Sequence, residues 1–233
     1  MGKLSDVIEK VQKLLNLADK SDKPGEIASA QKLAQQLITK YQIEEAQLNN
    51  HLGTGGIVCK RIDTPKPYAI DKSILLNSIS KHNFCKVLRG DKYCIIYGYT
   101  SDIEICIALY NTLLVHMFSE MNTKLDKAKD QTFDEFNAKA WARSFFTGYS
   151  ITISERIKQS KQDTIDEGSK SDTSIAVIMS DKQFAVEEYF QKIERKKAKE
   201  FRLSSNDGFL EGKKSGKKAV VNPTLESDAS EQT

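Results

Sequence analysis

Hydrophobic residues recur every three or four positions at the start of the chain, which is the spacing of one face of an α-helix. Ser5 precedes the first such run, where its side chain can cap free backbone N–H groups, and the run ends near Asp19. A polar turn follows, and Pro24 suits the first position of a second helix. The pattern therefore predicts an antiparallel helical hairpin over residues 4–45. The apolar positions are Val7, Ile8, Val11, Leu14, Leu15 and Ala18, then Ile27, Ala30, Leu33, Ala34, Leu37, Ile38 and Tyr41.

Glycine, proline and asparagine interrupt this pattern over residues 49–71, which predicts a linker between two domains. One short strand, 57–62, is expected within it. Asp71 then stands where it can cap a third helix. That helix carries Ile74, Leu75 and Ile79 on its apolar side.

Two alternating runs predict a β-hairpin with strands over 83–88 and 93–97. Gly90 lies in the turn between them, where we expect it to supply the positive φ angle that a two-residue hairpin requires. We expect Cys94 and Ile95 to be buried.

The remainder of the chain is predicted to be mostly helical. Ser101 and Glu104 have the spacing of a capping box at the head of a long apolar core helix. The later segments are a helix over 133–161 with two apolar faces, an exposed polar loop over 160–173, a buried strand over 174–179 and a helix over 182–199.

These elements define an α+β protein, mostly helical, in which the N-terminal hairpin packs with a domain built from the β-hairpin and the long helix. The 233 residues, 39% hydrophobic and 29% charged, are typical of a soluble globular chain. The predicted divisions are a helical hairpin domain (1–48), a linker with a short strand (49–71), an α+β companion domain (72–200), a basic Gly/Lys segment (201–221) and a disordered tail (222–233).

The apolar segments and the cysteines indicate a cytoplasmic location. The longest apolar stretch, 105–118, is shorter than the ~18 residues of a membrane span, and the N-terminus has no apolar targeting segment. The four cysteines follow no spacing typical of a disulfide framework. We therefore expect a reduced compartment and no membrane partner.

Candidate chemistry is sparse. His82 and Cys85 form one short ligand pair, whereas a structural zinc site usually has two. We therefore expect no metal and no cofactor, and expect Cys85 and Cys94 to be small apolar core residues. The histidines lie in no nucleophile motif, and paired carboxylates such as Asp102 and Glu104 are expected to interact with helix N-termini. No catalytic residue is predicted.

Positive charge is concentrated near the C-terminus. Residues 192–218 contain ten basic and four acidic residues, whereas residues 1–191 are balanced at 25 against 25. Charge runs of this kind are most often simply solvated surface, and that alternative stays open. Clustered Lys and Arg beside aromatic residues can also neutralise phosphates and stack on bases, which is the basis for predicting nucleic-acid binding. The candidate residues are Lys192, Arg195, Lys196, Lys197, Lys199, Phe201, Arg202, Lys213, Lys214, Lys217 and Lys218.

Three glycines, Gly208, Gly212 and Gly216, recur at four-residue spacing within this basic segment. The spacing does not fit a phosphate-binding loop, which needs four residues between its glycines and Ser or Thr after the lysine. Two alternatives stay open. The glycines form one close-packing helix face with lysines on the other side, or the segment is a flexible basic linker.

The run from Val11 to Ala18, followed by the alanine, leucine and tyrosine pattern of 26–43, resembles DUF 2786, an uncharacterised family of bacterial and phage domains. Asn83-Phe84-Cys85, the 95–98 strand end with Asp102-x-Glu104 after it, Ser144-Phe145-Phe146-x-Gly148 and Gly212-x-x-x-Gly216 resemble the companion domain of that family. The resemblance implies a protein encoded by a phage or another mobile element. It supplies no catalytic residues.

These observations predict a non-enzymatic phage or mobile-element accessory protein that binds nucleic acid through its basic C-terminal segment. Two alternatives remain. One is an adaptor or inhibitor that binds a host or phage protein through the N-terminal hairpin, which an exposed apolar groove there would favour. The other is an enzyme with a site assembled from distant residues, which a deep pocket with converging carboxylates or His82 would favour.

Overall fold

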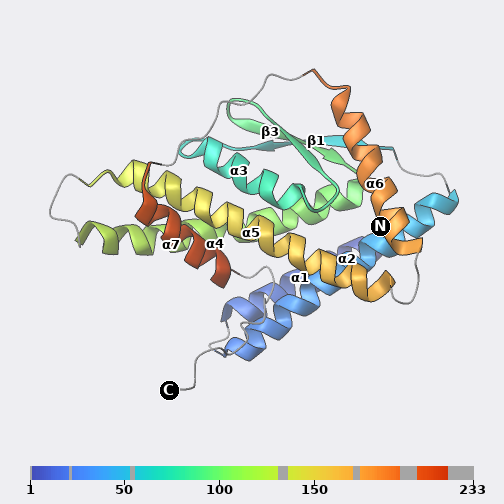
Figure 1. Cartoon of the computed structure of the whole chain (residues 1–233), viewed down its shortest axis with the longest axis horizontal. Coiled ribbons are helices and arrows are strands. Elements are labelled where there is room, and N and C mark those ends of the chain that lie inside the picture. Colours follow the sequence, from blue (N-terminus) through green and yellow to red (C-terminus); the bar gives the residue numbers. More distant parts are fainter. Residues whose placement is uncertain are drawn as a thin grey trace.

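A computed structural model describes residues 2–20, 23–52, 56–130, 136–169, 174–194 and 204–219. Over these ranges the chain forms seven helices and one three-stranded antiparallel sheet (Figure 1), which confirms the mostly helical α+β class. The elements are α1 (Gly2–Lys20), α2 (Pro24–Leu52), β1 (Val58–Asp63), α3 (Ala69–Ser80), β2 (Lys86–Arg89), β3 (Tyr93–Gly98), α4 (Thr100–Asp130), α5 (Ala138–Ser169), α6 (Ser174–Gln191) and α7 (Asn206–Lys218).

The N-terminal helical hairpin is confirmed, with α1 and α2 lying side by side (Figure 1). Val7 and Val11 of α1 are buried, as are the small residues Ala30 and Ala34 of α2, which allow the two backbones to approach closely. Both helices are longer than predicted. Because α1 begins at Gly2, Ser5 lies inside the helix rather than capping it, and α2 continues into the predicted linker.

The sheet has the strand order β1-β3-β2, and its side chains alternate between two faces. Cys94 and Ile96 of β3 are fully buried in the core, so Ile95 points to the opposite face and is only half-buried. The expected burial is thus correct for Cys94 and wrong for Ile95. An alternating pattern defines two faces, but only the neighbouring helices decide which face is covered.

The hairpin turn and the start of α3 differ in detail from the prediction. Gly90 does not have the expected positive φ; a Cβ atom there would lie 2.5 Å from Cζ of Tyr93, so a larger residue would displace the tyrosine ring. Helix α3 begins after Tyr68, which has a φ of 63°, and has no side-chain cap. Asp71 lies within the first turn, buried and 4.0 Å from Arg143.

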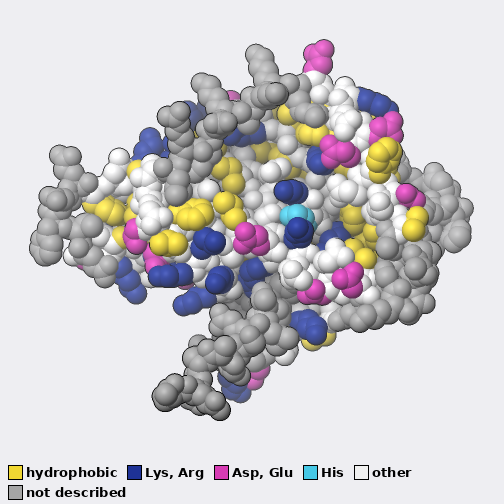
Figure 2. Space-filling model, in the orientation of Figure 1, with side chains coloured by type: hydrophobic (Ala, Val, Ile, Leu, Met, Phe, Trp, Pro, Cys, Tyr) yellow, Lys and Arg dark blue, Asp and Glu magenta, His cyan; other side chains and the backbone are white. Residues whose placement is uncertain are grey.

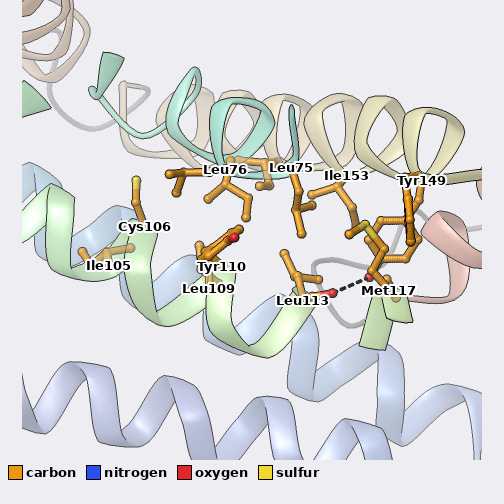
Figure 3. Packing of buried hydrophobic residues seen from close by; sticks show 14 of the residues in the cluster. Leu75, Leu76, Ile105, Cys106, Leu109, Tyr110, Leu113, Met117, Tyr149 and Ile153 are labelled. Atoms are coloured by element: carbon orange, nitrogen blue, oxygen red, sulfur yellow. Dashed lines mark hydrogen bonds between the residues drawn. The ribbon is translucent and has the colours of Figure 1, made fainter. Parts of the chain in front are cut away.

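The core lies between α3, α4 and α5, where Leu75 and Leu76 of α3 face Tyr110 and Leu113 of α4 (Figure 3). The hydroxyl group of Tyr149 on α5 donates a hydrogen bond to the backbone oxygen of Leu113 at 3.4 Å. The predicted long core helix is therefore confirmed as α4. It starts one residue before Ser101, which consequently lies in the first turn instead of capping the helix.

Among the described residues, α4 is the one helix long and apolar enough to cross a membrane by length and composition. Half of its most apolar window is buried inside the fold, and residues such as Leu109 and Met117 pack in the core. A core helix of a soluble protein has the same properties.

Three predictions for the region after residue 133 need correction. The expected loop over 160–173 is helical up to Ser169, and Lys161 within it is buried rather than exposed. The expected strand over 174–179 is the first part of α6, since an apolar run this short fits either a strand or a buried helix turn. Helix α6 ends at Gln191, earlier than predicted.

Candidate functional site

Helix α7 lies against α5 through a face made almost entirely of glycine. A Cβ atom at Gly212 would lie 2.0 Å from the backbone oxygen of Phe145, and one at Gly148 of α5 would lie 2.2 Å from that of Phe209. The two backbones are therefore in direct contact, which confirms the close-packing alternative for this segment. The glycines that α7 contributes are Gly208, Gly212 and Gly216.

Side chains fix the N-terminal end of α7. Ser205 caps the helix by accepting a hydrogen bond from the N–H of Gly208 at 3.2 Å, and its own N–H donates to Oγ of Ser144 at 3.0 Å. Nε1 of Trp141 donates to the carboxylate of Asp207 at 2.7 Å. The start of the helix is thus held in place on α5.

Arg156 of α5 holds the other end of α7. Its guanidinium group donates to the backbone oxygen of Gly216 at 2.7 Å and to that of Ala219. A cation at this end of a helix is favoured by the helix dipole. Burial lowers the pKa of Arg156 to about 10, so the side chain is still charged at neutral pH.

The side of α7 that faces away from α5 carries the predicted lysines. Lys213 is partly exposed and the other three are exposed, and dark-blue side chains gather over α7 and the neighbouring end of α4 (Figure 2). Glu211 accepts hydrogen bonds from Lys214 at 2.7 Å and from Lys124 of α4 at 2.8 Å, and these bonds lower its pKa. The outward lysines are Lys213, Lys214, Lys217 and Lys218.

The other predicted nucleic-acid-binding residues are not part of this face. Lys192 follows α6 and donates to Glu188 at 2.9 Å. Because α6 and α7 lie on opposite sides of the molecule in Figure 1, Lys192 and the lysines of α7 belong to two separate surfaces. Arg195, Lys196, Lys197, Lys199, Phe201 and Arg202 lie outside the described residues.

A second charged cluster, which the sequence analysis missed, is buried where α2, α4, α5 and α6 meet. Its centre is Asp102 in the first turn of α4, which is fully enclosed. One carboxylate oxygen lies 2.8 Å from Nζ of Lys182 on α6, and the other accepts a hydrogen bond from Nε2 of Gln42 on α2 at 2.9 Å. The expected contribution of the α4 dipole is therefore only part of the role of Asp102.

Lys161 of α5 completes this cluster. Its ammonium group donates to Oε1 of Gln42 at 3.2 Å and to the backbone oxygen of His82 at 2.7 Å, and it lies 3.3 Å from the ring centroid of Phe84. Burial lowers the pKa of Lys161 to about 7, although Asp102 acts in the opposite direction. The cluster links the N-terminal hairpin to the rest of the fold.

The local sequence contains a signal for this cluster. Lys182 lies between Met179 and Val186 at helical spacing, and Lys161 lies four residues after Ile157, so both lysines interrupt buried faces. A lysine in such a position is rarely buried unless it is paired. Because both lysines and Asp102 are less than one-tenth exposed, the cluster suits a structural connection better than substrate binding.

His82 has a partner but no catalytic constellation among the described residues. Its Nε2 lies 3.0 Å from Oγ of Ser154, and burial together with Lys81 and Lys158 lowers its pKa to about 4. The imidazole is therefore neutral at pH 7. Asp102 is the carboxylate of the nearby cluster, and no group of three or more His, Cys, Asp or Glu in the described ranges could hold a metal.

The cysteines have the predicted apolar surroundings in the core. Cys85, Cys94 and Cys106 are buried and Cys59 is exposed, and all four are free thiols. Burial raises the pKa of Cys85 and of Cys94, which keeps both thiols protonated.

A small apolar groove lies between the N-terminal hairpin and α4. Its empty volume is about 210 Å³, including open solvent. Sites for small molecules usually measure about 300–1,000 Å³, so this groove is smaller than a typical ligand site. The lining residues are Val7, Ile8, Val11, Ile38, Ile105, Ala108 and Leu109.

The N-terminal hairpin matches a known family. Residues 6–45 fit the family model described as "Protein of unknown function (DUF2786)", which confirms the resemblance over this part of the chain. No curated protein and no solved structure gives a match. The family description contains no activity, so any function has to be argued from the geometry.

Proposed function

We propose that this chain is a non-enzymatic nucleic-acid-binding protein whose basic segment, residues 192–218, contacts phosphate groups. The supporting observation is the arrangement of α7. Its glycine face has no room for any side chain, so Lys213, Lys214, Lys217 and Lys218 all lie on the free side of a helix that is fixed at both ends.

Such a surface fits phosphate better than it fits base edges. Lysine is a flexible point charge that neutralises phosphate but carries no base information. Of the four lysines, Lys214 shares Glu211 with Lys124, which leaves a net positive face. Binding is therefore independent of nucleotide sequence and sensitive to salt.

The setting that we propose follows the family resemblance. The protein acts in the cytoplasm as an accessory protein of a phage or another mobile element. It needs no cofactor for this role.

The test is a salt titration of binding to a labelled 20-base-pair duplex, followed by fluorescence anisotropy. Each lost phosphate contact should reduce the log–log salt slope by about 0.9, so K213Q/K214Q/K217Q/K218Q should reduce it by about 2 to 4. The matched control is K10Q/K13Q/K32Q/K40Q, which removes four exposed charges from the N-terminal hairpin. Equal effects of the two variants, or no binding by the unaltered protein at low salt, would overturn the proposal.

A further inference from the structure

The strand-bearing part of the chain carries a second excess of positive charge, which the balance of the first 191 residues conceals. Between residues 58 and 93 there are eight basic residues and three acidic ones. The basic residues are Lys60, Arg61, Lys66, Lys72, Lys81, Lys86, Arg89 and Lys92, and the acidic ones are Asp63, Asp71 and Asp91.

The sheet in this region has one face in the core and one face that is only partly covered. Ile95 pairs with Arg61 of β1 on one side and with Leu88 of β2 on the other, so these three residues form a row on the face opposite the core. Helix α6 covers one end of this face, where the ring of Phe190 lies 5.7 Å from that of Tyr97.

Within the described parts of the chain, no helix covers the other end, next to the hairpin turn. Leu88, Tyr93 and Ile95 are half-buried there, and the side chain of Arg61 is 64% exposed. This end therefore presents an apolar platform next to a cation.

Arg61, Tyr93 and Gly90 form a layered arrangement on this platform. Because a Cβ atom at Gly90 would lie 2.5 Å from Cζ of Tyr93, the ring lies directly against the backbone of Gly90. The guanidinium carbon of Arg61 lies 4.0 Å from the centroid of the same ring, and its Nε donates to Asp63 at 3.2 Å. The guanidinium group thus contacts both the Tyr93 ring and Asp63, while 64% of the Arg61 side chain is exposed.

We propose that this open end of the sheet binds single-stranded nucleic acid, with a base on the guanidinium plane of Arg61 and its neighbours Leu88 and Ile95. The inference rests on the proposed nucleic-acid function and specifies that the ligand is single-stranded. Unpaired bases stack on arginine planes and apolar side chains, whereas the bases of a duplex are already stacked on each other. On this face the cation is that of Arg61, since Lys60 and Arg89 pair with the core residues Ile96 and Cys94 and Lys86 forms an ion pair with Glu187.

The experiment compares a labelled 20-nucleotide single strand with a duplex of the same sequence, by anisotropy at low salt. R61A should weaken single-strand binding about tenfold and duplex binding much less, since stacking is worth a factor of about 5 to 150 per base. R61K keeps the charge but loses the plane, and should weaken single-strand binding nearly as much. The matched control is R89A, because Arg89 pairs with Cys94 and therefore belongs to the other face of the same hairpin.

The outcomes separate this inference from the proposed function. If R61A and R89A have equal effects on both ligands while the α7 variant still reduces the salt slope, only the sheet inference is wrong. If the unaltered protein binds neither ligand, both are wrong. If a poly-glutamate peptide binds with the same affinity and the same sensitivity to R61A, charge alone explains the surface and stacking is excluded.

Discussion

The lysines of α7 and the lysines of the buried cluster differ in their exposure to solvent. On α7, Lys214, Lys217 and Lys218 lie in solvent because the other side of the helix is backbone and glycine. In the cluster, Lys161 and Lys182 are enclosed by four helices. Lys182 contacts the carboxylate of Asp102 directly, and Lys161 is linked to it through the side chain of Gln42.

This difference in solvation decides which lysines are available for binding. A solvated lysine is free to exchange its counterions for a phosphate, whereas a desolvated lysine requires its partners in order to remain charged. The α7 lysines are therefore suited to ligand binding and the buried ones to holding the hairpin on the fold. Four predictions test this contrast.

The largest expected effect is that of D102A. This variant leaves Lys161 and Lys182 buried without the carboxylate that they share, and removing one partner of a buried ion pair costs about 3–5 kcal/mol. The free energy of unfolding, measured by urea denaturation, should fall by that amount. E104A is the control, two residues further along the same helix, and an equal loss in both variants would contradict the assignment.

G212A should destabilise the protein by about 1–3 kcal/mol, because the new methyl group would lie 2.0 Å from the backbone oxygen of Phe145. The gain in helix propensity from Gly to Ala, about 1 kcal/mol, opposes this loss but cannot relieve an overlap with backbone. Thermal unfolding measures the effect. At Gly56, where a Cβ atom meets nothing within 4 Å, the same substitution should have little effect.

The free energy of unfolding should depend on pH because the pKa of Lys161 is lowered by burial. Its pKa is about 7 in the fold and about 10.4 in an unfolded chain, so the unfolded state binds more protons between these values and stability rises with pH. The window to measure is about pH 7 to 8.5, because above it the raised thiol pKa values of Cys85 and Cys94 act in the opposite direction.

K161M should flatten the rise in unfolding free energy over this window. A matched K158M variant removes an exposed lysine three residues earlier on the same helix and should leave the slope unchanged. A slope that persists in K161M would show that another group is responsible.

The smallest expected effect is that of K214Q. Lys214 and Glu211 form an exposed i, i+3 pair, and exposed pairs contribute little because water screens them. The melting temperature should be unchanged within error, even though under the proposed function we expect the same substitution to weaken nucleic-acid binding. A loss of stability as large as that of G212A would mean that Lys214 is structural.

Local sequence patterns are sufficient to predict those elements whose buried residues recur at a regular spacing. The hairpin of α1 and α2 and the core helix α4 follow from 3.6-residue periodicity, which depends only on neighbours in sequence. Residues 174–179 differ, because an apolar run of five residues after Ser174 has too few repeats to separate a strand from a helix turn. Residues 160–169 differ because a polar residue need not be exposed, as buried Lys161 shows.

Sequence patterns are enough to predict the mostly helical α+β class, the glycine spacing that brings α7 onto α5, and the sign of the charge near the C-terminus. Only the tertiary structure decided that Ile96 rather than Ile95 enters the core, and that Lys161 and Lys182 are enclosed whereas Lys217 is solvated. The physical reason is that desolvation is a property of all the atoms around a group. For Lys161 those atoms come from residues as far apart in the chain as Gln42 and Lys182, and no local pattern records their meeting.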